Sequence, residues 1–275
     1  MAKTEAETEI EKMKILEERI KAPSIWCRLP CGIRFEDLQD IRYDDAAQLL
    51  DDHYLNQEVT YRSVNIKNDK EATEEFLNNA RIWMKDKMSI AAVNEENEEL
   101  IGVIIMRIQE KCAFSRTFSR VKLTYNLIYA SIMLFYNEIE KSVNLYDKLE
   151  VRKYLKVYAL ALEECYRHKG LGKELIKSAI SLATSAHVPA ISGIFTSQRS
   201  QNLAAELGFV KFNEIYYNKY FTNDQVLFTD TDEDSSAALM AYRIPDVEEV
   251  ADLEIQQLAR FNIETADGEH NSKNS

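Results

Sequence analysis

The spacing of apolar residues in the first half of the chain predicts one strand, two helices and a hairpin. The strand covers Gly32–Leu38, and helical spacing of apolar residues follows over Arg42–Tyr54 and Asp69–Lys87. Two further apolar runs, Ser89–Asn94 and Leu100–Ile108, are separated by a short acidic turn. This arrangement is typical of a β-hairpin.

The second half of the chain continues with alternating helices and strands. Residues 121–150 contain no glycine or proline and are apolar in the middle, which predicts one or two helices. The β-prone segment Lys156–Leu162 leads through a loop, Glu163–Lys169, into an amphipathic helix over Lys173–Ala186. A strand, a short helix closed by a glycine and two final strands follow: Ala190–Phe195, Ser200–Leu207 with Gly208, Phe209–Tyr220 and Ala238–Ile244.

No linker rich in proline, glycine or serine interrupts this order, so we expect one mixed α/β domain over residues 23–246. Residues 1–22 are charged throughout and predict a short helix or a disordered segment, and residues 247–275 predict a C-terminal helix and polar tail. The first segment lacks the apolar stretch of a signal peptide. The longest apolar run, Leu127–Tyr136, is too short for a bilayer, which needs about 20 residues. We therefore expect a cytoplasmic protein.

The overall charge limits the class of ligand. The 275 residues include 34 lysines and arginines against 46 aspartates and glutamates, a net charge of −12. Nucleic acid needs a basic surface and is excluded as the main partner, whereas a negative field favours cationic ligands. The four cysteines and four histidines do not stand at metal-ligand spacing, so we expect reduced thiols and no bound metal.

A cluster of positive charge stands out against this acidic background. Arg167, His168, Lys169 and Lys173 surround the segment Gly170-Leu171-Gly172, between a predicted strand and the amphipathic helix. The unpaired N–H groups of a first helical turn attract anions, and glycines let a phosphate approach the backbone closely. A tight turn alone would not need the basic residues, so the cluster predicts a site for a polyanion.

The spacing Arg-x-x-Gly-x-Gly is shorter than the dinucleotide fingerprint and lacks the Gly-Lys-Ser/Thr of a nucleotide P-loop. Arg167–Gly172 instead resembles the acetyl-CoA loop of the GNAT superfamily of N-acetyltransferases, within a region from about Gly32 to Ile244. This resemblance implies a mixed, mostly antiparallel sheet flanked by helices, with strands splayed around acetyl-CoA as co-substrate. The residues that it implies for cofactor binding are Leu160, Ala161, Leu162, Arg167, His168, Lys169, Gly170, Leu171, Gly172, Lys173 and Ser197.

Further segments resemble the insect arylalkylamine N-acetyltransferase branch of that superfamily. Asn56–Val59 is similar to an Asp-Glu-Pro segment after the first helix, with the glutamate retained and the proline replaced. The resemblance implies that Glu58 deprotonates the amine through ordered water. It also implies Thr196 and Ser200 as proton donors to the thiolate, although Ser200 fits the N-cap of the last helix equally well. Ala204 replaces the tyrosine that many GNAT enzymes use as the acid.

The resemblance implies transfer of an acetyl group to the primary amine of a small arylalkylamine, of the dopamine, tyramine or serotonin class, by direct attack in a ternary complex. We expect a monomer that has no nucleic-acid or membrane partner. Two alternatives stay open. One is a GNAT enzyme for polyamines or another small amine, which the acidic charge fits equally well. The other is a catalytically weak CoA-binding module, because Val59 and Ala204 depart from the family pattern.

Overall fold

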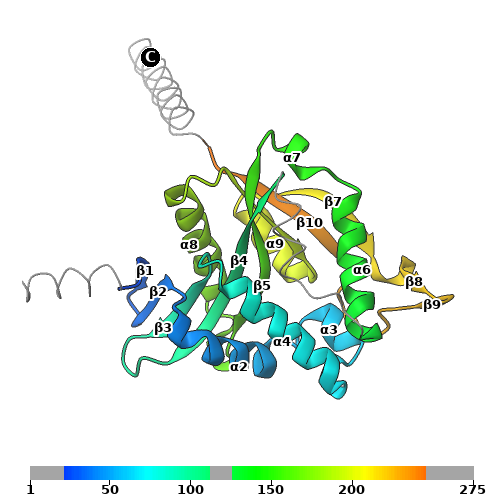
Figure 1. The fold of residues 1–275 in the computed structure, drawn as a ribbon, viewed down its shortest axis with the longest axis horizontal. Helices are drawn as coiled ribbons and strands as arrows, with labels where there is room; N and C mark the ends of the chain where they lie inside the picture. The colour runs from blue at the N-terminus through cyan, green and yellow to red at the C-terminus, as the bar shows by residue number, and fades with distance from the viewer. Residues whose placement is uncertain (1–21, 112–125, 246–275) are drawn as a thin grey trace, which may run out of the picture.

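The structure, a computed structural model, describes residues 22–111 and 126–245. The charged segment predicted over residues 1–22, except Ala22, and the helix and tail predicted over 247–275 lie outside the described residues. Within the described part, a large sheet occupies the centre and helices cover both of its faces (Figure 1). None of the helices in these two ranges is long and apolar enough to cross a bilayer.

Eight of the described strands form one sheet in the order β1-β2-β3-β4-β5-β6-β10-β7. Neighbouring strands are antiparallel except β5 and β6, which run parallel. This confirms the predicted mixed, mostly antiparallel sheet. The strands are β1 (Ile25–Leu29), β2 (Ile33–Asp37), β3 (Ile90–Asn94), β4 (Leu100–Glu110), β5 (Lys153–Leu162), β6 (Ala190–Phe195), β7 (Val210–Tyr216) and β10 (Ser236–Arg243), and β8 (Phe221–Thr222) pairs separately with β9 (Gln225–Val226).

The central strands are apolar on both faces because both faces are covered. Along β3, Ile90 and Ala92 belong to the apolar cluster beneath α8 (Leu171–Ser185). Ala91 and Val93 belong to the cluster beneath α2 (Tyr43–His53) and α4 (Lys70–Met84). Successive side chains of a strand point to opposite faces, so this alternation follows from the backbone. The helices are α2 (Tyr43–His53), α3 (Val59–Ser63), α4 (Lys70–Met84), α6 (Leu127–Lys141), α7 (Leu145–Lys148), α8 (Leu171–Ser185) and α9 (Gln198–Glu206).

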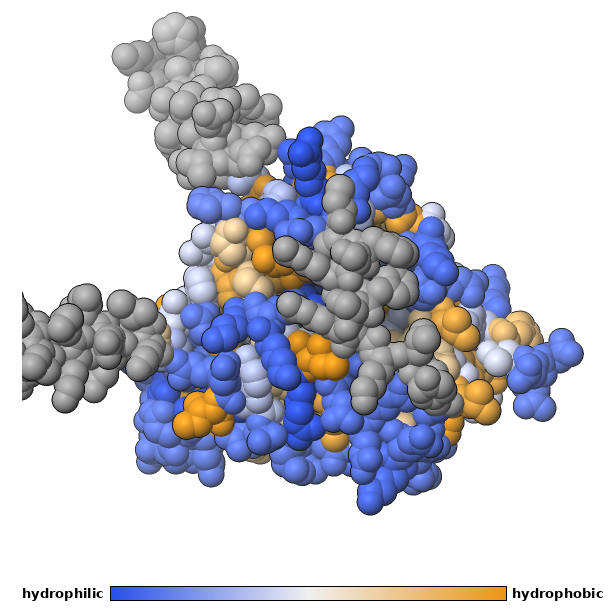
Figure 2. All heavy atoms as spheres, in the orientation of Figure 1, coloured by the Kyte–Doolittle hydropathy of each residue, from blue (hydrophilic) through white to orange (hydrophobic). Residues whose placement is uncertain are grey.

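The helices pack through the apolar stripes that the sequence shows. Helix α8 buries Leu175, Ala179 and Leu182, which lie on one helical face against the sheet. Helix α4 begins at the N-cap Asp69, whose carboxylate accepts a hydrogen bond from the Ala72 N–H at 2.9 Å. The face drawn in Figure 2 is largely hydrophilic, and the apolar residues visible on it lie in separate patches.

Several parts of the described fold differ from the prediction, and α3, β8 and β9 are not among the predicted elements. Strand β1 was not predicted because its residues are exposed or only half-buried and show no clear alternation. The strand predicted over Phe209–Tyr220 ends at Tyr216, where a 3₁₀ turn over Tyr217–Lys219 buries Tyr217 in the core. The last helix begins at Gln198 and not at Ser200.

The parallel pairing between β5 and β6 is short, and this opens a cleft. It runs from Leu155 beside Ile191 to Val157 beside Gly193 and then stops, although β5 continues to Leu162. Tyr158 is the extra residue of a bulge in the β4–β5 pairing, where Val157 and Ala159 face consecutive residues of β4. A bulge bends its strand and increases the local twist, so β5 leaves β6 at this point. The splayed strands predicted for the fold are confirmed.

Candidate active site

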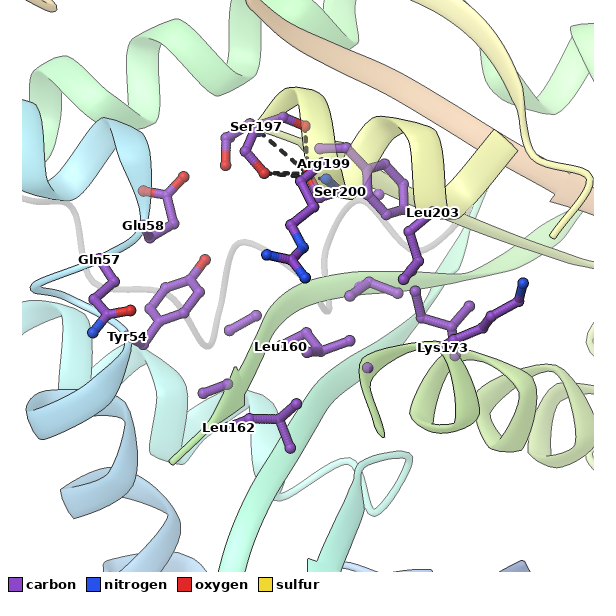
Figure 3. Close-up of a pocket in the computed structure, with 18 of the residues that line it drawn as sticks. Tyr54, Gln57, Glu58, Leu160, Leu162, Lys173, Ser197, Arg199, Ser200 and Leu203 are labelled. Atoms are coloured by element: carbon purple, nitrogen blue, oxygen red, sulfur yellow. Dashed lines mark hydrogen bonds between the residues drawn. The ribbon is translucent and has the colours of Figure 1, made fainter. Parts of the chain in front are cut away.

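A cavity of about 440 Å³ lies where β5 and β6 diverge. Its walls come from the end of α2, the start of α3, the diverging parts of β5 and β6, and the first turns of α8 and α9 (Figure 3). Of the predicted site residues, Lys169 does not line the cavity, and its ammonium lies 5.5 Å from the centroid of the Tyr166 ring. The predicted residues that line it are Glu58, Leu160, Ala161, Leu162, Arg167, His168, Gly170, Leu171, Gly172, Lys173, Thr196, Ser197 and Ser200.

The first turn of α8 presents its backbone to the cavity. Gly170 is the N-cap, with a φ of +84° in the left-handed region that glycine adopts without strain. An added Cβ would meet no atom within 4 Å at Gly170, and at Gly172 it would meet only Leu160 Cδ2 at 3.9 Å. The two glycines therefore leave open space beside the N–H groups of a helix start, as an approaching phosphate requires.

Two cations of the predicted basic cluster already have partners in the protein. The Arg167 guanidinium donates from Nε to the Leu162 carbonyl at 2.9 Å and from Nη2 to the His53 carbonyl at 2.6 Å. Burial lowers the pKa of Arg167. The Lys173 ammonium donates to the Glu206 carboxylate at 2.8 Å. Arg167 thus ties the loop before α8 to the end of β5 and to α2, in addition to any contact with an anion.

Glu58 is the N-cap of α3 and lies on the side of the cavity opposite Lys173 (Figure 3). Its Oε2 accepts hydrogen bonds from the Thr60 hydroxyl at 2.6 Å and from the Tyr61 N–H at 2.9 Å. Its Oε1 is buried and has no hydrogen-bond partner of acceptable geometry among the described residues. Burial raises the pKa of Glu58, and the nearby hydroxyls of Thr196 and Thr60 offset part of this effect.

Phenols surround this carboxyl group, of which those of Tyr61 and Tyr217 are buried and those of Tyr54 and Tyr136 are half-buried. Burial raises the pKa values of Tyr54, Tyr61, Tyr136 and Tyr217, and the negative charge of Glu58 raises each of them further. The Tyr136 hydroxyl shares a 2.6 Å hydrogen bond with the Thr60 hydroxyl. The surroundings of Glu58 therefore consist of neutral hydroxyls and aromatic rings, and hydrogen bonds from hydroxyl and backbone N–H groups stabilise its charge only in part.

The loss of proline after Glu58 leaves the helix start intact. Val59 occupies the first position of α3, where proline is favoured because its fixed φ suits a helix and its missing N–H needs no partner. Valine also fits this position. The Glu58 backbone is extended, with φ −66° and ψ 131°, and the side chain caps the helix.

The three hydroxyl residues at the end of β6 have different surroundings. Ser197 is the N-cap of α9, and its Oγ accepts from the Ser200 N–H at 3.2 Å. The Ser200 hydroxyl completes a capping box by accepting from the Ser197 N–H at 3.2 Å. The N-cap interpretation of Ser200 is thus wrong, because Ser200 is the third residue of the helix. Thr196 precedes the cap, and its hydroxyl lies near Glu58.

Residues that were not predicted also line or support the cavity, among them Tyr54, Arg199, Tyr217 and Asp234. Tyr54 and Asp234 line it, and the Tyr217 hydroxyl donates to the Thr196 carbonyl at 2.5 Å. Arg199, in the first turn of α9, extends its guanidinium into the cavity (Figure 3). In the sequence, Arg199 lies between the predicted site residues Thr196 and Ser200. This neighbourhood is the one sequence signal that could have identified it. Asp234 lies in a segment with no predicted element.

A comparison with family models decides what kind of protein this is. Residues 50–209, more than half of the chain, match the model described as the Acetyltransferase (GNAT) family. The chain belongs to the GNAT acetyltransferase family. The matched residues include Glu58, the glycine turn of α8 and the first turn of α9. No curated protein sequence matches the chain significantly.

Solved structures show the same GNAT fold at low sequence identity. Arylalkylamine N-acetyltransferase 2 of Aedes aegypti superposes with a TM-score of 0.72 at 22% identity, covering 78% of this chain and 100% of that one. A second Aedes aegypti protein, provisionally named arylalkylamine N-acetyltransferase 7, superposes with a TM-score of 0.73 at 22% identity, covering 81% of this chain and 96% of that one. The polyamine N-acetyltransferase of Drosophila melanogaster superposes with a TM-score of 0.65 at 15% identity, covering 77% of this chain and 100% of that one.

The residues of this GNAT domain fit a CoA thioester in two respects. The glycine turn of α8 leaves open backbone for a diphosphate. The part of β5 beyond Val157 is not paired with β6, so the backbone groups of Tyr158–Ala161 on that edge are available to an extended ligand, whereas the Leu162 carbonyl accepts from Arg167. An acyl group bound there would lie between the glycine turn and Glu58.

Changing Gly172 to valine tests the assignment of the glycine turn. We expect Gly172→Val to weaken CoA binding by more than about tenfold, because the branched side chain fills the space a diphosphate needs. Isothermal titration calorimetry with CoA measures this effect, and thermal unfolding checks the fold. Gly170 is less suitable, since its positive φ would strain any side chain.

The matched control is Ser181→Val, which places the same side chain at an exposed position of α8 outside the cavity lining. Its CoA affinity should equal that of the wild type. If Gly172→Val folds normally and binds CoA as tightly as the control does, the turn does not hold the cofactor.

Proposed function

We propose that this GNAT enzyme transfers the acetyl group of acetyl-CoA to the primary amine of a small arylalkylamine, of the dopamine, tyramine or serotonin class. The transfer is direct attack in a ternary complex. The observation that carries the proposal is the buried Glu58 Oε1, which lacks a hydrogen-bond partner among the described residues and belongs to the same cavity as the glycine turn. One end of the cavity thus offers a base and the other an anion-binding backbone.

The chemistry assigns a role to that oxygen. An ammonium group has no lone pair, so it must lose a proton before its nitrogen attacks the thioester. Burial raises the pKa of Glu58, which makes its carboxylate a stronger base than an exposed one. The C–N bond forms as the C–S bond breaks, the amine proton passes to Glu58 directly or through water, and the thiolate takes up a proton. Holding both substrates in one cavity removes much of the entropic barrier.

Apolar and aromatic surroundings of Glu58 support an arylalkylamine as the acceptor. Tyr54, Val59 and Ile194 line the cavity. The Tyr54 ring lies parallel to the Phe76 ring, with 5.8 Å between the two centroids, so it is held in place. An aromatic substrate would bury apolar area against such a wall, and its ammonium is attracted to ring faces as well as to Glu58. The shared fold with two mosquito proteins named as arylalkylamine N-acetyltransferases agrees with this substrate class.

Thr196 and Ser200 are the proposed donors to the leaving thiolate. Both line the cavity, and Ala204 is fully buried in the core, so position 204 offers no side-chain donor. The Ser200 hydroxyl donates to the Ser197 carbonyl at 2.8 Å and must turn away from it to protonate a thiolate. The Thr196 hydroxyl lies beside Glu58 and needs no such change in the cap of α9.

A polyamine is the second candidate acceptor, and Asp234 is the observation that favours it. This second carboxylate lines the cavity and accepts from the Gln198 N–H at 2.7 Å through one oxygen. A diamine would place its reacting nitrogen near Glu58 and its other charge near such a carboxylate. The Drosophila polyamine N-acetyltransferase shares the fold at 15% identity.

Release of CoA from acetyl-CoA in the presence of different amines separates these possibilities. We expect release with tyramine, dopamine and serotonin and little release with spermidine or agmatine. Release with polyamines alone would replace the arylalkylamine assignment by the second candidate. Tight acetyl-CoA binding without release on any amine would identify a binding module and contradict enzymatic transfer.

The variant Glu58→Gln is the internal control of this assay. It keeps the size of the side chain but removes the base, so turnover with the preferred amine should fall by more than about tenfold while CoA affinity is retained. Glu138→Gln, at an exposed position on α6, should behave as the wild type does. Equal turnover of the two variants would remove Glu58 from the mechanism.

Two hydroxyl deletions test the proposed proton donors. Thr196→Val keeps the shape of the side chain and should lower kcat by about tenfold or more if its hydroxyl protonates the thiolate. Ser200→Ala should also cost about 1 kcal/mol of stability through the broken capping box, so its Tm is measured beside its kcat. If neither variant changes kcat by more than about twofold, the thiolate leaves without protonation by either hydroxyl.

A further inference from the structure

Arg199 is a cation in the cavity that the acetyl-transfer mechanism does not use. It stands in the first turn of α9, and Figure 3 shows its side chain crossing from that helix toward the region of Tyr54 and Leu160. Its guanidinium makes no hydrogen bond or ion pair with any residue of the described ranges. By contrast, the other lining arginine, Arg167, is held by two backbone carbonyls.

The two carboxylates that line the cavity form no ion pair with Arg199. Glu58 directs Oε2 to Thr60 and Tyr61, and Asp234 accepts from the Gln198 N–H at 2.7 Å. The N-terminus of α9 adds a partial positive charge at the same place, because the dipole of this helix ends there. Arg199 is an exposed residue that lines the cavity, and its guanidinium stays charged without a partner among the described residues, so it is suited to a ligand anion.

The phosphates of CoA have a different binding place. The open backbone for a diphosphate lies at Gly170 and Gly172, beside Lys173, and Figure 3 shows Lys173 on the side away from Glu58. The Arg199 side chain points toward Tyr54, on the Glu58 side of the cavity. Its guanidinium therefore reaches toward the place where the acyl group and the amine would meet.

We propose that Arg199 recognises a carboxylate carried by one of the two reacting partners, either on the acyl group of the thioester or on the amine. This inference rests on the proposed function for the pairing of a CoA thioester with an amine, and it extends the substrates beyond acetyl-CoA, tyramine, dopamine and serotonin, none of which carries a carboxylate. The planar guanidinium pairs with a carboxylate through two parallel N–H···O bonds, which gives both direction and affinity. An acceptor such as an aromatic amino acid would then satisfy Glu58 with its ammonium and Arg199 with its carboxylate.

Matched substrate pairs that differ by one carboxylate test the proposal. The acceptor arm compares tyrosine with tyramine, using acetyl-CoA as donor. The donor arm compares succinyl-CoA with acetyl-CoA, using tyramine as acceptor. In one arm, we expect Arg199→Gln to lower kcat/KM for the carboxylate-bearing member by about tenfold or more. The neutral member should stay within about twofold of the wild type.

Arg243→Gln is the control variant, since Arg243 is an exposed arginine on β10 that does not line the cavity. This variant should leave kcat/KM unchanged for both substrates in both arms. An Arg199→Lys variant should restore only part of the discrimination, because an ammonium cannot form the bidentate pair. The arm in which discrimination falls identifies which partner carries the carboxylate.

Equilibrium binding separates a failure of this proposal from a failure of the proposed function. The wild-type protein could turn over no amine and still bind succinyl-CoA more tightly than acetyl-CoA. If Arg199→Gln abolishes that preference, Arg199 recognises a carboxylate on the acyl group even though the proposed acetyl transfer has failed. Weaker acetyl-CoA binding in Arg199→Gln would show a phosphate contact and overturn it. Equal effects on charged and neutral members, or no effect in either arm, would also overturn it.

Discussion

The early end of the pairing between β5 and β6 is the constraint on which the site depends. After Val157 and Gly193 the two strands separate, because the bulge at Tyr158 bends β5 away from its parallel neighbour. The backbone of β5 is then left with an unpaired edge inside the protein, which must be satisfied by water or a ligand. The glycine turn of α8, the cap of α9 and the start of α3 all lie around this opening. The shape of the sheet therefore brings the candidate site residues together.

The electrostatics of the cavity follow from what each charged group already contacts. The net charge of −12 pointed to a cationic substrate and a separate basic site for an anion. In the structure Glu58 and Lys173 still lie on opposite sides of the cavity (Figure 3). Two cations of the predicted basic cluster, Arg167 and Lys173, already contact protein oxygens. We propose that backbone N–H groups at Gly170–Gly172 supply much of the anion binding. Glu58 and Arg199 then provide opposite charges with unused bonding capacity on the other side of the cavity.

Local patterns were enough to predict the helices other than α3, most strands and the glycine turn, since each depends on residues a few positions apart. The environment of Glu58 was not predictable in this way. Its phenol neighbours Tyr136 and Tyr217 come from distant segments, and only packing brings them together. The exact start of α9 was also not predictable. Both Ser197 and Ser200 are residue types favoured at an N-cap, and the choice between them depends on where β6 ends. Strand β1 was missed because an edge strand need not bury either face.

The proposed acetyl transfer depends on Glu58 being a stronger base than an exposed glutamate. A direct test is the titration of the Glu58 side chain by NMR, using glutamate labelled with ¹³C at the carboxyl carbon and the Glu58→Gln spectrum to assign the signal. Burial raises the pKa of Glu58, so its signal should titrate above the ordinary glutamate value of about 4.3, at which exposed glutamates change. A Glu58 signal that titrates at or below that value would contradict its assignment as the base.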